Sequence, residues 1–155
     1  MAYLWASAIS SSIIVVDNGN ANYSSENGVF YNKDKTELIC YPAGKTDVEF
    51  VIPNTVTSIG YGSFYGCSAL EDLSFPNSVT NIGYLAFFEC TSLDSITIPV
   101  SVSCIGEAAF SNCTSLSEIN YAGTVAQWNS ITKESDWNTG APAEIVICSD
   151  GNVSL

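Results

Sequence analysis

The segment Ile52-Pro-Asn-Thr-Val-Thr-Ser-Ile-Gly60 returns along the chain at a fixed interval of 23 residues. Its first pair recurs as Phe75-Pro76 and as Ile98-Pro99. Four further columns keep the same interval: Gly60, Gly83 and Gly106; Phe64, Phe87 and Phe110; Cys67, Cys90 and Cys113; Leu70, Leu93 and Leu116. Because several unrelated columns share one period, residues 52–121 are predicted to be an array of stacked copies of one unit.

Each copy is predicted to make one turn of a solenoid. Residues 93–98 form a short strand with inward apolar side chains, and the following proline ends it because proline lacks a backbone N–H. Val102 and Ile105 are expected to point inward from an extended return segment. Gly106 is expected to permit a tight turn, and residues 109–113 to make about one helical or 3-10 turn. Stacking would bury the phenylalanines as one column and the cysteines as another.

The composition indicates a folded, acidic chain. Of its 155 residues, 46% are hydrophobic and 13% are charged, which suits one domain with a substantial core. Sixteen acidic residues and four lysines give a formal net charge of −12, which disfavours nucleic acid and anionic membranes as partners. No apolar run is long enough for a transmembrane helix, so no membrane insertion is predicted.

Two residue types are absent, and their absence argues against an enzyme. The chain has no histidine and no arginine. Without histidine, Ser-His-Asp and Cys-His catalysis within the chain are excluded, and without arginine the best bidentate clamp for phosphate or carboxylate is lost. We therefore assign no catalytic residue, no cofactor and no metal ligand.

The repeats resemble a known family. The phrases Ile52-Pro-Asn-Thr-Val-Thr-Ser-Ile-Gly60 and Cys90-Thr-Ser-Leu-Asp-Ser-Ile-Thr-Ile-Pro99 look like BspA-type leucine-rich repeats. Residues 28–42 resemble the irregular hairpin unit of that family, and residues 123–129 and 148–151 resemble its carboxy-terminal element. The resemblance implies an α/β leucine-rich-repeat solenoid, with a parallel sheet on the concave side and extended segments and short 3-10 or helical turns on the other. It also implies adhesion to host or matrix proteins, and an extracellular or cell-surface location.

We predict one domain over residues 1–155, with an irregular N-terminal unit in residues 1–51, regular repeats in residues 52–121 and a C-terminal cap in residues 122–155. The mildly apolar start, residues 1–9, has no basic region and is interpreted as the first structural segment, or as a boundary within a longer protein, rather than as a signal peptide. Residues 13–16 are expected to be a strand, because a strong turn signal follows them. Residues 29–31 and 37–41 are expected to pair as a hairpin, and residues 48–52 to be the next strand.

The repeat pattern breaks after Tyr121. Thr124 is expected to N-cap a short helix over residues 125–131, and residues 144–147 to be a last strand. Terminal units of solenoids must cover an exposed core edge. Trp128 and Trp137 are therefore interpreted as cap residues rather than ligand platforms.

The six cysteines raise the question of disulfides or a metal. The column of Cys67, Cys90 and Cys113 is expected to point one way, so we predict buried thiols with no disulfide among them. Zinc is disfavoured because a linear column is not a tetrahedron and no histidine or C-x-x-C spacing exists. The state of Cys40, Cys104 and Cys148 stays open at this point.

The polar positions of the strands form the candidate binding surface. They make three columns on the concave face: Glu71, Asp94 and Ser117; Asp72, Ser95 and Glu118; Ser74, Thr97 and Asn120. Repeat proteins commonly bind through such a sheet, although a solvated acidic face would also explain the columns. If a ligand binds, a basic peptide or a hydroxyl-rich glycan suits the face. Its carboxylates have no closed pocket for glycoside hydrolysis and no calcium loop.

A second group of exposed residues is aromatic. Tyr61, Tyr65, Tyr84 and Phe88 flank the turn after each repeat glycine, and packing between repeats is the favoured interpretation over a ligand strip. Our leading hypothesis is a non-catalytic interaction or adhesion module, monomeric, with a protein or glycan ligand. The alternatives are a structural spacer without a ligand, and a carbohydrate-recognition module attached to an enzyme.

Overall fold

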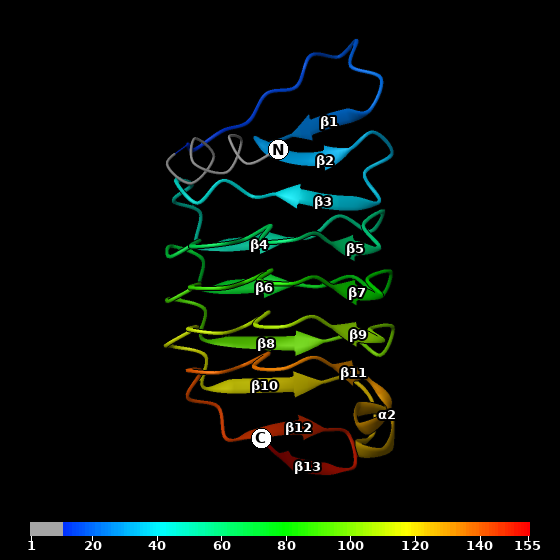
Figure 1. The fold of residues 1–155 in the computed structure, drawn as a ribbon, viewed down its shortest axis with the longest axis vertical. Helices are drawn as coiled ribbons and strands as arrows, with labels where there is room; N and C mark the ends of the chain where they lie inside the picture. The colour runs from blue at the N-terminus through cyan, green and yellow to red at the C-terminus, as the bar shows by residue number, and fades with distance from the viewer. Residues whose placement is uncertain (1–10) are drawn as a thin grey trace.

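The computed structural model describes residues 11–155, so the predicted first segment, residues 1–9, lies outside the described residues. Successive repeats stack as turns of a solenoid along the long axis of the molecule (Figure 1). One row of strands contains β4 (Glu49–Val51), β6 (Asp72–Ser74), β8 (Ser95–Ile98), β10 (Glu118–Tyr121), β12 (Ile145–Cys148) and β13 (Gly151–Ser154). β4 pairs in parallel with β6, and β8, β10 and β12 pair in parallel, which confirms the predicted parallel arrangement.

The opposite row of strands is more regular than expected. It consists of β1 (Tyr23–Glu26), β2 (Val29–Asn32), β3 (Glu37–Cys40), β5 (Ser58–Ile59), β7 (Asn81–Ile82), β9 (Cys104–Ile105) and β11 (Thr132–Lys133). These seven strands form one continuous sheet in the order β1-β2-β3-β5-β7-β9-β11. The segment predicted as an extended return is therefore a second parallel ladder, because each two-residue strand bonds to its copy in the next repeat.

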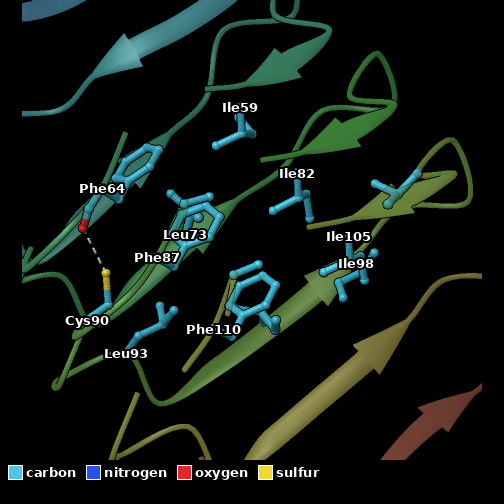
Figure 2. Close-up of a cluster of buried hydrophobic side chains, with 14 of the residues drawn as sticks. Ile59, Phe64, Leu73, Ile82, Phe87, Cys90, Leu93, Ile98, Ile105 and Phe110 are labelled. Atoms are coloured by element: carbon cyan, nitrogen blue, oxygen red, sulfur yellow. Dashed lines mark hydrogen bonds between the residues drawn. The ribbon is translucent and has the colours of Figure 1, made fainter. Parts of the chain in front are cut away.

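The predicted core columns are confirmed. Phe64, Phe87 and Phe110 are fully buried and stack, with ring centroids 4.8 Å and 5.0 Å apart (Figure 2). Tyr41 extends the stack at one end at 5.2 Å, and Trp137 closes the other edge-on at 6.2 Å. A unit of 23 residues cannot bury these rings alone, so stacking supplies the core.

The segment after each repeat glycine is not helical, which corrects the expected helical or 3-10 turn over residues 109–113. It is a run of hydrogen-bonded turns. Two positions in each copy have left-handed backbone angles, at Gly62, Leu85 and Ala108 and again at Gly66, Glu89 and Asn112. Bonds between neighbouring turns, such as Phe87 N–H to the Ala109 carbonyl at 2.7 Å, hold this conformation although leucine and alanine disfavour it. We call this stack of turns the turn ridge.

Glycine is required at Gly60, Gly83 and Gly106 for a different reason from the one expected. None of these glycines has a left-handed φ. A Cβ on Gly83 would lie 2.8 Å from the Ile59 carbonyl oxygen, and one on Gly106 would lie 2.7 Å from the Tyr84 nitrogen. Glycine is required here because the backbones of adjacent repeats approach closely, not because of turn geometry.

The two ends are irregular. At the N-terminus β1, β2 and β3 pair antiparallel, which confirms the predicted hairpin between β2 and β3. Residues 13–16 are not a strand, contrary to the prediction, because their contacts are isolated bonds such as Ile14 N–H to the Gly28 carbonyl. At the C-terminus β12 turns back into β13, so the predicted last strand is half of a hairpin.

The predicted capping helix is present as α2 (Val125–Ser130). Thr124 caps it in a capping box with Gln127, in which each residue's side chain accepts a bond from the other's backbone N–H. Trp128 is buried and lies 5.8 Å from Trp137 and 5.4 Å from Tyr121, centroid to centroid. Both tryptophans therefore cover the core edge, as predicted.

Candidate functional site

The outward side chains of β4, β6, β8, β10 and β12, with the residue preceding each of β6, β8 and β10, form one surface, called the sheet face below. The nine predicted residues all lie there, exposed or half-buried: Glu71, Asp72, Ser74, Asp94, Ser95, Thr97, Ser117, Glu118 and Asn120. The parallel register places Ser95 beside Glu118 and Thr97 beside Asn120, so the structure brings the predicted columns together.

The sheet face extends beyond the regular repeats. On one side β4 adds Glu49 beside Asp72 and Val51 beside Ser74. On the other side β12 adds Ile147 beside Asn120, and Ile145 lies two residues before it. Val51 is 72% exposed, and the two isoleucines are 38% and 37% exposed, so apolar side chains border the polar centre at both ends.

Sequence reasoning missed these border residues because they do not follow the 23-residue period. Asn120 and Ile147 are 147 − 120 = 27 positions apart, since α2 is inserted between their strands. The alternation of polar and apolar residues in Val48-Glu-Phe-Val51 and Glu144-Ile-Val-Ile147 is the signal that could have found them.

The sheet face is acidic throughout. Its carboxylates are Glu49, Glu71, Asp72, Asp94 and Glu118, all exposed. Neighbouring polar groups bind two of them, since the Asn120 amide donates to Glu118 at 2.6 Å and the Ser117 hydroxyl donates to Asp94 at 3.3 Å. The face therefore presents uncompensated negative charge to a partner.

The four lysines of the chain lie elsewhere, at the two ends of the solenoid. Lys35 pairs with Glu26 and Lys45 with Asp47, each at 3.0 Å. Lys33 donates to the Asn20 carbonyl at 2.6 Å, and Lys133 donates to the Trp128 carbonyl at 2.8 Å. Each ammonium group therefore binds partners at the same end of the solenoid, and none of these partners is a carboxylate of the sheet face.

A depression of about 220 Å³ lies on the sheet face between β6 and β8. Its polar lining comes from Asp72, Ser74, Asn77, Ser95 and Thr97. β6 and β8 belong to different hydrogen-bonded sheets, so the depression lies where the strand ladder is interrupted. Four of these lining residues are strand residues of the predicted columns, but sequence periodicity contains no signal for the interruption.

The cysteine column has a structural role. All six cysteines are thiols in the structure. The thiol of Cys90 donates to the Phe64 carbonyl at 3.1 Å (Figure 2). The thiol of Cys113 donates to the Phe87 carbonyl at 3.0 Å, so each thiol bonds to the preceding repeat. Burial raises the pKa of Cys90 well above its ordinary value, which keeps this thiol neutral and poorly nucleophilic.

The aromatic residues of the turn ridge pack in pairs between repeats. Tyr65 stacks on Phe88 with centroids 5.2 Å apart, and Tyr61 lies 5.3 Å from Tyr84. Tyr65 and Phe88 are half-buried, which confirms the packing interpretation for that pair. Tyr61 and Tyr84 keep 53% and 42% of their surface exposed.

Two further features concern metal and membrane sites. Within residues 11–155, no group of three or more carboxylate or thiol side chains is arranged to hold a metal ion. In the same part of the chain, no helical segment has the length and apolarity that crossing a bilayer requires.

The fold and the sheet face can be compared with known proteins. A family model described as the BspA type leucine-rich repeat region matches residues 44–149 in six copies. A solved leucine-rich repeat protein from Eubacterium ventriosum is 41% identical, with a TM-score of 0.65 over 72% of this chain and 30% of that one. No curated protein matches the chain at a significant level.

Two other bacterial structures share the fold. A leucine-rich cell surface protein from Faecalibacterium prausnitzii is 30% identical, with a TM-score of 0.50 over 82% of this chain and 46% of that one. The pneumococcal vaccine antigen PcpA is 25% identical, with a TM-score of 0.60 over 74% of this chain and 34% of that one. This chain spans less than half the length of each. Since the family model covers most of the sequence, the chain belongs to the BspA-type leucine-rich-repeat family.

Proposed function

We propose that this chain is a non-catalytic interaction module of a secreted or cell-surface bacterial protein, and that it binds a partner protein through the sheet face. The observation that carries the proposal is the extended, in-register sheet face, with a polar acidic centre and exposed Val51, Ile145 and Ile147 at its borders. Binding surfaces commonly combine exposed apolar contacts with polar ones. The surface location is supported by the relative from F. prausnitzii, which is described as a cell surface protein.

The charge of the sheet face selects the kind of partner. With a formal net charge of −12 and lysines confined to the ends of the solenoid, the face attracts a basic protein surface and repels an acidic one. Because the carboxylates are exposed, we expect binding to weaken as the salt concentration rises.

The test is capture of the chain on a panel of immobilised extracellular-matrix proteins, measured by surface plasmon resonance at two salt concentrations. The double variant Asp72→Lys, Glu118→Lys should abolish capture. The charge-matched control Glu107→Lys, Glu134→Lys changes exposed carboxylates on the turn ridge and beside it, and should keep capture. Equal loss in both variants would show that only net charge matters and would contradict binding through the sheet face.

The same experiment separates the proposal from a structural spacer. A spacer needs the stacked core but no ligand, so it predicts capture on none of the matrix proteins, even at low salt. Capture that survives Asp72→Lys, Glu118→Lys but is lost with changes at Tyr61 and Tyr84 would instead transfer binding to the turn ridge.

A further inference from the structure

The second regular repeat departs from its neighbours at one position. Phe75 occupies the column that contains Ile52, Ile98 and Tyr121 in the other repeats. Those three side chains are 1%, 0% and 4% exposed, whereas Phe75 is only half-buried. The interior beside it is already filled by the phenylalanine stack, where the Phe75 ring meets Phe87 edge-on at 5.7 Å. Phe75 therefore keeps part of its surface outside the core, unlike the other side chains of its column.

The strand ladder is interrupted at the same repeat. β6 pairs with β4 over three residues, and β8 pairs with β10 over four. Between β6 and β8 the described residues form no ladder, although the bond from Asp94 N–H to the Glu71 carbonyl at 3.3 Å keeps the two repeats adjacent. The main-chain ladder that joins β4 to β6 and β8 to β10 is thus missing beside the depression.

The lining of the depression has a distinctive chemistry. Phe75 is among the apolar residues that line it, and the polar side chains of the lining are two hydroxyls of serine, one of threonine, one amide and one carboxylate, from Ser74, Ser95, Thr97, Asn77 and Asp72. Each of these polar groups can donate to or accept from a neutral hydroxyl, and no cationic side chain lines the depression. The volume of the depression, about 220 Å³, is below that of sites for drug-sized ligands, so the depression fits one small ring.

We propose that the depression between β6 and β8 is a subsite for one neutral sugar ring of a glycan. The apolar face of a pyranose lies against Phe75, and its hydroxyls bond to the short polar side chains of the lining. Anionic sugars are excluded because Asp72 repels them and nothing in the lining compensates their charge. This inference rests on the proposed function, since the glycan would be carried by the partner protein that binds the sheet face.

The test is NMR titration of the isotope-labelled chain with the methyl glycosides of galactose, mannose and N-acetylglucosamine, and with sialic acid as the anionic comparison. We expect saturable shifts with at least one neutral glycoside, confined to residues 72–77 and 95–97, and none with sialic acid. Phe75→Ile restores the residue found at Ile52 and Ile98, so it should fold normally and weaken binding about tenfold or more. The matched control, Phe88→Ile, changes a half-buried phenylalanine of the turn ridge and should leave binding unchanged.

A second variant keeps the ring and removes one hydroxyl. Thr97→Val preserves the shape of the side chain and should weaken binding of the same glycoside about fivefold. Absence of saturable shifts with all three glycosides, or binding that survives Phe75→Ile, would overturn the subsite. If the subsite fails while Asp72→Lys, Glu118→Lys still abolishes capture on matrix proteins, the proposed function stands and only the sugar is excluded.

Discussion

The inward columns and the outward rows of the same strands differ in how strictly they repeat. Inside, phenylalanine occupies three successive repeats at positions 64, 87 and 110, and cysteine does so at positions 67, 90 and 113. Outside, Asp72, Ser95 and Glu118 stand in one row with three different side chains. An inward side chain must fit copies of itself above and below, whereas an outward one meets solvent. The scaffold is therefore encoded by repetition, whereas the outward rows vary from one repeat to the next.

The strongest test of this difference uses two adjacent residues of one type. Phe87 is fully buried between Phe64 and Phe110, while Phe88 is half-buried on the turn ridge against Tyr65. Phe87→Ala should lower the free energy of unfolding by about 3–5 kcal/mol because it opens a cavity in the stack. Phe88→Ala should cost about 1 kcal/mol. Urea unfolding measures both, and equal losses would show that the interior is not what holds the repeats together.

Two glycines provide a second contrast. A Cβ on Gly83 would lie 2.8 Å from the Ile59 carbonyl oxygen and 3.0 Å from the Gly60 carbonyl carbon, so Gly83→Ala must separate two repeats and should cost about 3 kcal/mol. Gly66 has a φ of +69° but nothing within 4 Å of an added Cβ. Gly66→Ala should therefore cost only about 1 kcal/mol of backbone strain. A reversed order in thermal or urea unfolding would contradict the close approach between repeats.

The buried thiols predict a dependence on pH. Burial raises the pKa of Cys90 well above its ordinary 9.0, and hydrogen bonding with Cys90 together with burial raises that of Cys113. Below about pH 9 the thiols are protonated in both the folded and the unfolded chain, so their contribution to stability is complete. As pH rises further, unfolded thiols ionise and buried ones do not. Ionisation of each of these thiols in the unfolded chain then lowers the free energy of unfolding by up to about 1.4 kcal/mol per pH unit.

The measurement is urea unfolding at a series of pH values above 9. Cys90→Ala and Cys113→Ala should each flatten the decline, whatever their effect on stability at neutral pH. A slope unchanged in both variants would mean that the decline comes from the buried tyrosines, such as Tyr31, whose pKa burial raises to about 12.

The smallest expected effect concerns an imperfect inward column. Ser63 is fully buried where the next repeats have Ala86 and Ala109, and its hydroxyl has no hydrogen-bond partner. Ser63→Ala should therefore raise the free energy of unfolding by about 1 kcal/mol, because an unsatisfied buried hydroxyl is removed. A loss of stability in urea unfolding would show that this hydroxyl is satisfied in solution.

Much of the fold could be predicted because a period of 23 residues identifies the columns, and Thr124 and Trp128 identify the C-terminal cap. The conformation of the turn ridge could not. Leu85 and Ala108 have left-handed backbone angles against their own preference, since bonds to neighbouring turns override local propensity. Only Gly62 and Gly66, in the two left-handed columns, indicate this conformation in the sequence. The second ladder could not be predicted for another reason. A strand of two residues is too short to show an alternation of polar and apolar side chains.

The candidate site was predictable where it follows the period and hidden where it does not. The spacing predicts that the nine polar residues lie on one surface, as they do in the structure, while their role in binding stays a prediction. Val51 and Ile147 border it through strand pairing across irregular units, which no period describes. The depression beside Phe75 lies where the ladder between β6 and β8 is interrupted, and no spacing in the sequence shows which strands fail to pair.

The most direct test of binding through the sheet face is carboxyl footprinting of the chain alone and in complex with a captured matrix protein. Carbodiimide labelling followed by mass spectrometry reports each exposed carboxylate separately. We expect Glu71, Asp72, Asp94 and Glu118 to become protected in the complex, while Glu107 of the turn ridge and the neighbouring Glu134 stay fully labelled. Protection of Glu107 and Glu134, with the sheet face still labelled, would contradict binding through the sheet face.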